Sequence, residues 1–87
     1  MSKISIIIPT INEANNLPLL LSDLSIIHKE GEILIVDCGS EDRTIDIANI
    51  YGAKVYNAKK EIEVYSWPQV LKIQKENGSY FYMQIQD

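Results

Sequence analysis

Polar side chains follow two apolar runs of the chain, and these side chains are the best candidates for binding a ligand. Thr10, Asn12 and Glu13 follow the run Ile4–Ile8, and Asp37 ends a second apolar run. A carboxylate at the end of a buried strand can reach a ribose hydroxyl or an N–H group of a base. The same acid could instead cap the turn that follows it, so the residues alone leave both roles open for Asp37.

The loop after the first run lacks the glycines that a dinucleotide site requires. Residues 9–17 contain no glycine, whereas a glycine-rich turn lets the backbone approach a pyrophosphate in NAD and FAD proteins. The Walker A pattern is also missing from the sequence. The single cysteine, Cys38, has no evident histidine partner for nucleophilic catalysis. Dinucleotide, P-loop and cysteine-dependent chemistry are therefore not expected.

Alternating strands and helices are expected to position the polar groups. Short apolar runs predict strands near residues 3–8, 32–37, 53–56 and 79–85. Helical spacing and capping residues predict helices at about residues 14–28, 43–51 and 66–77. Strands separated by helices imply a parallel sheet with right-handed crossovers, and we expect the first strand to be central. Residues 58–65 fit either a loop or a short edge strand.

Capping residues define the expected ends of these helices. Asn12 or Thr10 is expected to cap the first helix, and Gly52 suits a left-handed residue after the second. Ser66 and Pro68 are typical of a helix start and predict the third helix. Trp67, next to them, is expected to pack on the core.

Length and composition restrict the class of protein. The 87 residues allow one small domain, and the net charge of -4 argues against a general nucleic-acid binder. A lone cysteine cannot form an intrachain disulfide, and the run Ile4–Ile8 is too short to cross a membrane. The N-terminus does not resemble a secretory leader. We therefore expect a cytoplasmic chain without a membrane segment.

Two stretches of the sequence carry a family resemblance. Residues 4–16, ISIIIPTINEANN, resemble the opening of family 2 glycosyltransferases, in which an apolar strand precedes Pro-Thr-Tyr-Asn-Glu. Residues 33–44, ILIVDCGSEDRT, are similar to the second motif of that family, Val-Val-Asp-Asp-Gly-Ser-Thr-Asp-Gly-Thr. The spacing between the two stretches also fits, and the likeness weakens after Ala58.

The resemblance implies an α/β fold of the GT-A type, with a Rossmann-like parallel sheet flanked by helices, and a nucleoside-diphosphate sugar as donor substrate. On the matching positions, Thr10, Asn12 and Glu13 would line the nucleoside pocket, and Asp37 would bind the base or the ribose. Helix capping remains an alternative for Asn12 and Glu13, and the two roles can coexist. Ile11 stands where the family has an aromatic residue, which weakens base stacking there.

The family resemblance also bears on metal binding. The fourth strand of the family ends in an Asp-X-Asp motif that binds Mg²⁺ or Mn²⁺, ions that prefer oxygen ligands. Asp87 falls at the last acid of that motif, and Ile85 stands at the first. The resemblance thus implies a metal ligand at Asp87, while a plain chain terminus fits the same residue.

The sequence as a whole predicts the N-terminal, nucleotide-binding part of a glycosyltransferase-like fold, truncated at about four strands and spanning residues 1–87. Hexosyl transfer is implied by the resemblance, and the isolated chain is expected to be inactive because no acceptor half follows. The alternative is a non-catalytic nucleotide-binding or oligomeric remnant. A homo-oligomer is expected, built mainly from residues after Ala58.

Overall fold

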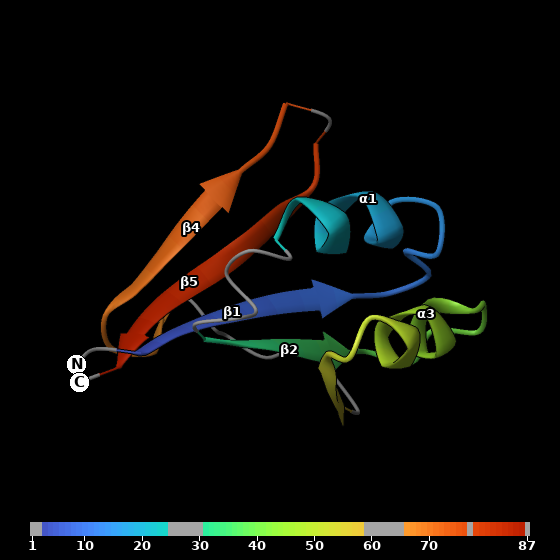
Figure 1. Ribbon diagram of the computed structural model, residues 1–87, viewed down its shortest axis with the longest axis horizontal. Coiled ribbons are helices and arrows are strands. Elements are labelled where there is room, and N and C mark those ends of the chain that lie inside the picture. The colour runs from blue at the N-terminus through green and yellow to red at the C-terminus, as the bar shows by residue number, and fades with distance from the viewer. Residues whose placement is uncertain (1–2, 25–30, 59–65, 77, 87) are drawn as a thin grey trace.

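The computed structural model describes residues 3–24, 31–58, 66–76 and 78–86, which form a mixed sheet with two helices packed on one face (Figure 1). The strands are β1 (Lys3–Thr10), β2 (Glu32–Asp37), β3 (Lys54–Asn57), β4 (Val70–Gln74) and β5 (Tyr80–Gln86). The helices are α1 (Leu17–Asp23) and α3 (Thr44–Ile50). None of the helices in these ranges is long and apolar enough to cross a membrane.

The central strand of the sheet is β1, as predicted. The strand order is β3-β2-β1-β5-β4, and β1, β2 and β3 run parallel to one another. β5 pairs with β1 in the antiparallel sense, and β4 pairs with β5 in the same way. The predicted α/β fold is confirmed, and β1, β2 and β3 are parallel as predicted. The prediction of a parallel sheet is wrong for β4 and β5.

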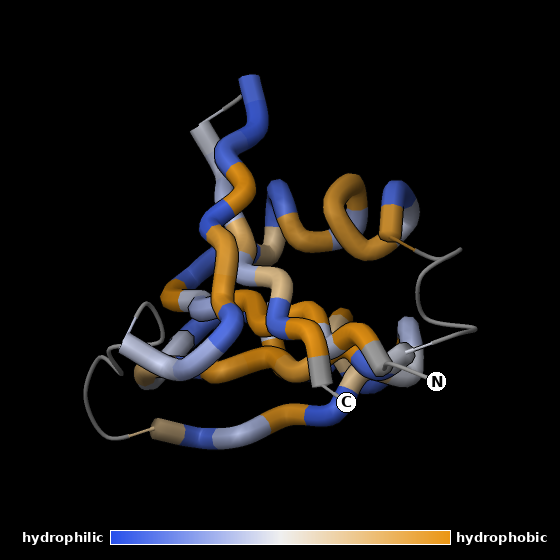
Figure 2. The backbone as a smooth tube through the Cα atoms, turned by 90° about the vertical axis from the view of Figure 1, so that its left-hand side faces the viewer, coloured by the Kyte–Doolittle hydropathy of each residue, from blue (hydrophilic) through white to orange (hydrophobic). Residues whose placement is uncertain are grey.

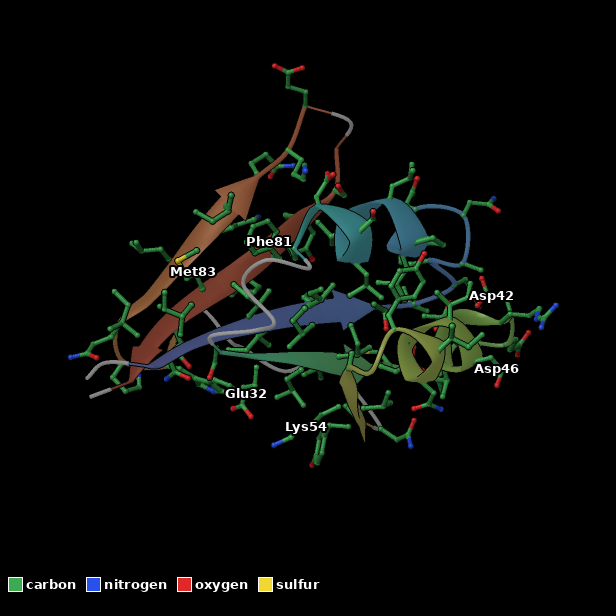
Figure 3. All side chains as sticks on the ribbon, viewed as in Figure 1. Glu32, Asp42, Asp46, Lys54, Phe81 and Met83 are labelled. Atoms are coloured by element: carbon green, nitrogen blue, oxygen red, sulfur yellow. The ribbon has the colours of Figure 1, made fainter. Side chains whose placement is uncertain are left out.

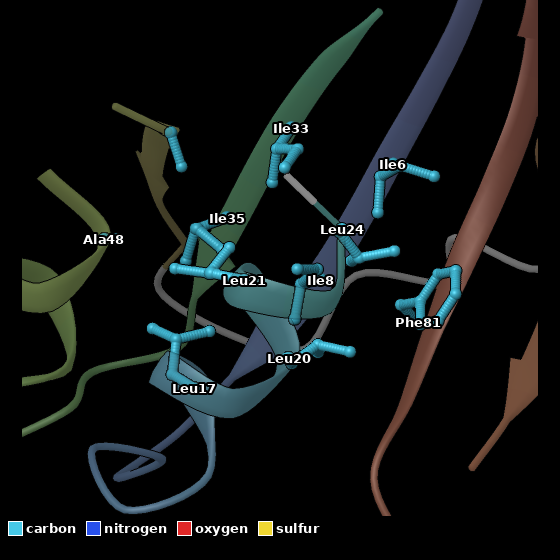
Figure 4. Close-up of a cluster of buried hydrophobic side chains, with 11 residues drawn as sticks. Ile6, Ile8, Leu17, Leu20, Leu21, Leu24, Ile33, Ile35, Ala48 and Phe81 are labelled. Carbon is cyan, nitrogen blue, oxygen red and sulfur yellow. The ribbon is translucent and has the colours of Figure 1, made fainter. Parts of the chain in front are cut away.

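The main hydrophobic core lies between the sheet and its two helices. Alternate residues of β1 and β2 point to this side, where leucines of α1 pack against them (Figure 4). The buried members are Ile6, Ile8, Leu17, Leu20, Leu21, Leu24, Ile33, Ile35, Ala48, Ala53 and Phe81. Burying one Leu or Ile side chain contributes about 1.5–3 kcal/mol, so this layer fixes α1 and α3 on the sheet. Figure 2 shows the same concentration of hydrophobic residues at the centre of the sheet.

A smaller cluster covers the opposite face of the sheet. Ile7, Val36 and Tyr82 are buried there, and Trp67 and Tyr80 pack against them. The prediction that Trp67 packs on the core is confirmed. Both faces of β1 are therefore covered, which explains why three consecutive residues of this strand, Ile6, Ile7 and Ile8, are apolar.

The helix predicted for residues 66–77 is wrong, because this segment contains strand β4. Val70 and Ile73 are β-branched, and the sequence Asn-Gly at residues 77–78 is a strong hairpin signal. In the turn, the Lys75 N–H donates to the Ser79 carbonyl at 2.9 Å. The β4–β5 hairpin projects from the body of the molecule in Figures 1 and 2. Pairing with β5 thus outweighed the helix-start signals.

The start of the first helix also differs from the prediction. α1 begins at Leu17 with Asn16 as its N-cap residue, and no side chain caps it. Capping by Asn12 or Thr10 is therefore wrong, and the predicted residues 25–28 lie outside the described ranges. The second helix is confirmed as α3, and Gly52 follows it with a φ of 78°, a left-handed conformation that glycine adopts without strain.

Candidate functional site

Thr10 and Asp37 meet where β1 and β2 end. They are register partners in the parallel pair, and the exposed fractions of their side chains are 2% and 1%. The Thr10 hydroxyl donates to Asp37 Oδ1 at 2.7 Å. The Cys38 N–H donates to the Thr10 carbonyl at 2.9 Å and extends the pairing by one step. The structure thus brings these two candidate residues together at the carboxyl edge of the sheet.

The Asp37 carboxylate accepts four hydrogen bonds from within the chain. Oδ1 accepts from the hydroxyls of Thr10 and Ser40, and Oδ2 accepts from the N–H groups of Gly39 and Ser40 at 3.1 and 2.8 Å. Gly39 has a φ of 100°, which a residue with a side chain adopts only with strain. An ionised carboxylate offers about four acceptor sites, so these bonds use all of them.

The charge of Asp37 follows from the same contacts. Burial alone raises the pKa of Asp37, but the hydrogen bonds from Ser40, Thr10 and Gly39 outweigh burial and hold the pKa below its ordinary value of 3.8. The carboxylate is therefore ionised at neutral pH and can only accept hydrogen bonds.

Asn12 joins the first loop to the second through its backbone and its side chain. Its N–H donates to Ser40 Oγ at 2.8 Å, and its Oδ1 accepts from the Glu41 N–H at 2.8 Å. Asn12 has a φ of 52°, a left-handed conformation that asparagine tolerates better than most residues. The side-chain oxygen of Asn12 therefore holds the two loops together through its hydrogen bond with the Glu41 N–H.

The next two residues of the first loop are held in a similar way. The Glu13 N–H donates to Thr44 Oγ1 at 2.9 Å, and the Ala14 N–H donates to Asp42 Oδ2 at 3.1 Å. Asp42 Oδ1 in turn accepts from the hydroxyl and the N–H of Thr44. These bonds, from the Thr44 hydroxyl above all, hold the pKa of Asp42 below its ordinary value. Asp42 lies at the start of α3, far from Glu32 at the other end of β2 (Figure 3).

We call this set of interlocked residues the loop clasp, and its members are Thr10, Asn12, Asp37, Ser40, Asp42 and Thr44. Sequence reasoning missed the last three. Their signal was the short-range pattern in which an Asp is followed two or three residues later by Gly, Ser or Thr, because such an Asp accepts from the backbone of those residues.

Glu13 contributes its backbone to the clasp and turns its side chain elsewhere. Glu13 Oε2 accepts from Asn16 Nδ2 at 3.3 Å. Both residues, with Thr10, line a cavity of about 70 Å³ between α1 and the start of β5. The other lining residues are Ile8, Pro9, Leu17, Leu20, Gly78, Ser79 and Tyr80. A space of this size holds a few water molecules, whereas ligand pockets measure roughly 300–1,000 Å³. This cavity is therefore too small for a nucleoside.

The described residues do not fit the predicted divalent metal ion. No group of three His, Cys, Asp or Glu side chains gathers in residues 3–24, 31–58, 66–76 and 78–86. Asp87, the predicted ligand, lies outside those ranges. Gln86 pairs with Lys3, so the carboxyl end of β5 lies at the opposite end of β1 from Thr10. We therefore derive no chemical step through a metal.

Comparison with known proteins places these observations in context. The family model of glycosyl transferase family 2 matches residues 5–80 of the chain. A curated relative, the 4,4'-diaponeurosporenoate glycosyltransferase of Staphylococcus haemolyticus, is 44% identical over 64 residues. That match covers 74% of this chain and 17% of the relative, so the chain aligns with less than a fifth of the relative's length. No solved structure gives a significant match.

Proposed function

The chain belongs to glycosyl transferase family 2, and on this premise we propose that the loop clasp binds the nucleoside end of a nucleoside-diphosphate sugar. The observation that supports the proposal is that three backbone N–H groups of the first loop already donate hydrogen bonds within the chain. Asn12, Glu13 and Ala14 all donate to side chains of the second loop. Anion sites depend on free N–H groups, so this loop is a poor cradle for phosphates.

The groups around the clasp suit a ligand that donates hydrogen bonds. Asp42 is exposed and its pKa is lowered, so it is ionised at neutral pH and can accept hydrogen bonds from a ligand. Asp37 is ionised as well, and it adds its negative charge from a buried position without contact. Ribose hydroxyls and base N–H groups are donors, whereas a diphosphate would be repelled by these carboxylates. The charge and the bonding of the clasp therefore favour the nucleoside over the diphosphate.

Ile11 provides an apolar surface at the tip of the first loop. Its side chain is 57% exposed, and it lies between Thr10 and Asn12, which are both fixed by the clasp. Burial of apolar area against a base contributes about 25 cal/mol per Å². We propose that Ile11 packs against the flat face of the base, where the family has an aromatic side chain.

Glycosyl transfer itself is proposed for this protein on the family alone. Inverting transfer needs a general base within hydrogen-bond reach of the acceptor hydroxyl, and we assign no such base to the described residues. Nucleotide binding without transfer is the second candidate function.

A thermal-shift titration with UDP and GDP tests the binding proposal. A nucleotide at a hundred times its Kd adds about 2.7 kcal/mol of apparent stability. For a domain of this length that raises the melting temperature by about 11–22 °C. No rise with either nucleotide would contradict the proposal.

A pair of matched variants assigns any binding to the clasp. Ile11→Asp removes the apolar contact and adds a charge beside the ligand, so we expect it to weaken binding by about tenfold or more. Leu19→Asp makes the same change at a residue that is 63% exposed on α1, and it should leave the affinity unchanged. Equal effects of the two variants would place the ligand elsewhere.

A further inference from the structure

The hydrogen bonds that the Asp37 carboxylate accepts indicate whether this side chain can contact a ligand directly. A direct contact with a ligand requires a free acceptor site, yet all of them are used and the side chain is 1% exposed. A nucleoside would have to displace Thr10, Gly39 or Ser40 first. We infer that Asp37 is a positioning residue, which shapes the first loop through Ser40 and does not touch the nucleotide. The inference rests on the proposed nucleoside site.

Ser40 transmits the effect of Asp37 to the first loop. Its hydroxyl has a single hydrogen, which it donates to Asp37 Oδ1, because an ionised carboxylate can only accept. The lone pairs of Ser40 Oγ are then free to accept from the Asn12 N–H at 2.8 Å. Asp37 thus sets the orientation of the hydroxyl, and the hydroxyl sets the position of Asn12.

The same arrangement occurs a second time in the clasp. The Thr44 hydroxyl donates to Asp42 Oδ1 and accepts from the Glu13 N–H at 2.9 Å. Two neighbouring N–H groups of the first loop are therefore each held by a hydroxyl that a carboxylate orients. Asp42 is exposed and water can replace its contacts, whereas Asp37 is buried and water cannot. The positioning effect should accordingly be larger for Asp37.

Hydrogen exchange of backbone amides tests the positioning effect without a ligand. Asp37→Asn replaces one accepting carboxylate oxygen with an NH₂ group, which can only donate, so we expect the Asn12 and Glu41 amides to exchange about tenfold faster or more. The Leu24 amide, which donates to the Leu20 carbonyl in α1, is the internal control and should not change. Ser40→Ala should give the same pattern, and Ser40→Thr, which keeps the hydroxyl, should restore protection. Unchanged exchange at Asn12 in Asp37→Asn would overturn the inference.

Nucleotide affinity separates positioning from direct contact. If Asp37 acts through Ser40, then Asp37→Asn and Ser40→Ala weaken UDP and GDP binding by the same factor, and the double variant is no worse than either. If Asp37 touches the nucleoside, Asp37→Asn alone weakens binding, or the loss is confined to one base, and the inference is wrong. Should the unmodified chain bind neither nucleotide, the proposed function fails, and the exchange experiment still decides whether Asp37 positions the loop.

Discussion

The hydroxyl of Thr44 is the part of the clasp whose removal has the clearest expected effect on stability. Thr44 is fully buried, and its Oγ1 accepts from the Glu13 N–H. Thr44→Val replaces the hydroxyl with a methyl group of similar size and leaves that N–H without a partner. An unsatisfied, partly buried donor costs about 1–3 kcal/mol. Asp42 loses a bond as well, but it is exposed and water can replace the lost donor.

A loss of about 2 kcal/mol is large for a domain of this length, because each kcal/mol shifts the melting temperature by about 4–8 °C. We therefore expect Thr44→Val to melt about 8–16 °C below the unmodified chain. Urea unfolding gives the free energy, with Trp67 fluorescence and far-UV circular dichroism as two probes. Trp67 is the single tryptophan of the chain and packs on the cluster around Ile7.

Thr44→Ser is the matched control, because it keeps the hydroxyl and removes a buried methyl group. Such a deletion costs about 0.5–1.5 kcal/mol, so Thr44→Ser should lie between the unmodified chain and Thr44→Val. The opposite order, with Thr44→Val as stable as the unmodified chain, would mean that Thr44 acts through packing. In that case the hydroxyl contributes nothing, and the account of the clasp fails.

Four further outcomes are expected. Leu21 is buried, so Leu21→Ala should lower the free energy of unfolding by about 2–5 kcal/mol. Leu19 is exposed on the same helix, so Leu19→Ala should lower it by less than about 0.5 kcal/mol. Equal losses would contradict the assigned core. The folded-state pKa of Asp37 is lowered, so its stabilisation is complete above pH 3.8 and is lost as the pH falls further, and melting curves should show a smaller acid-induced loss in Asp37→Asn. Light scattering should give a mass above that of the monomer, because Leu71 and Ile85 are exposed near the edge strand β4, and a monodisperse monomer would end that prediction. Millimolar Mg²⁺ or Mn²⁺ should leave the melting temperature unchanged with and without UDP, and a clear rise would reveal a metal site that the described residues do not form.

The first half of the fold could be predicted because its signals are local and agree with one another. Four of the five residues in the run Ile4–Ile8 are isoleucine, and three of these are consecutive, which is typical of a strand covered on both faces. α3 has a glycine, Gly52, at the position where a left-handed residue ends a helix. In these elements the structure favoured by the local sequence is also the one favoured by tertiary packing, so the sequence pattern was enough to predict them.

The hairpin of β4 and β5 shows where local signals fail. Ser66 and Pro68 are typical of a helix start, and the structure places a turn there instead. The partner that stabilises β4 is β5, with Val70 opposite Gln84 and Gln74 opposite Tyr80. A search for helix caps does not detect such pairing, although the sequence Asn-Gly at residues 77–78 is itself a hairpin signal.

In the candidate site, too, one part could be predicted from the sequence and another part could not. The meeting of Thr10 and Asp37 follows from the rule that parallel strands end at one edge, so sequence was sufficient. The saturation of Asp37 depends on the backbone dihedral angles of residues 38–40, which turn two N–H groups and one hydroxyl toward it. The composition and the spacing of residues do not determine these dihedral angles. The sequence therefore located the acid but left its ligand and turn-capping roles open.

The direction of β5 determines what the end of that strand can reach. The metal prediction at Asp87 assumed a last strand parallel to β1, whose carboxyl end would lie beside Asp37. β5 runs the other way, with Gln86 opposite Lys3. From Lys3 to Thr10 the strand rises about 3.3 Å per residue, or about 23 Å in all. Gln86 therefore lies at the far end of β1 from the clasp, and Asp87 itself lies outside the described residues. With β5 in this direction, the described residues of the clasp come from β1, β2, α3 and the two loops between them, and the hydroxyls of Ser40 and Thr44 hold the first loop in place through the Asn12 and Glu13 N–H groups.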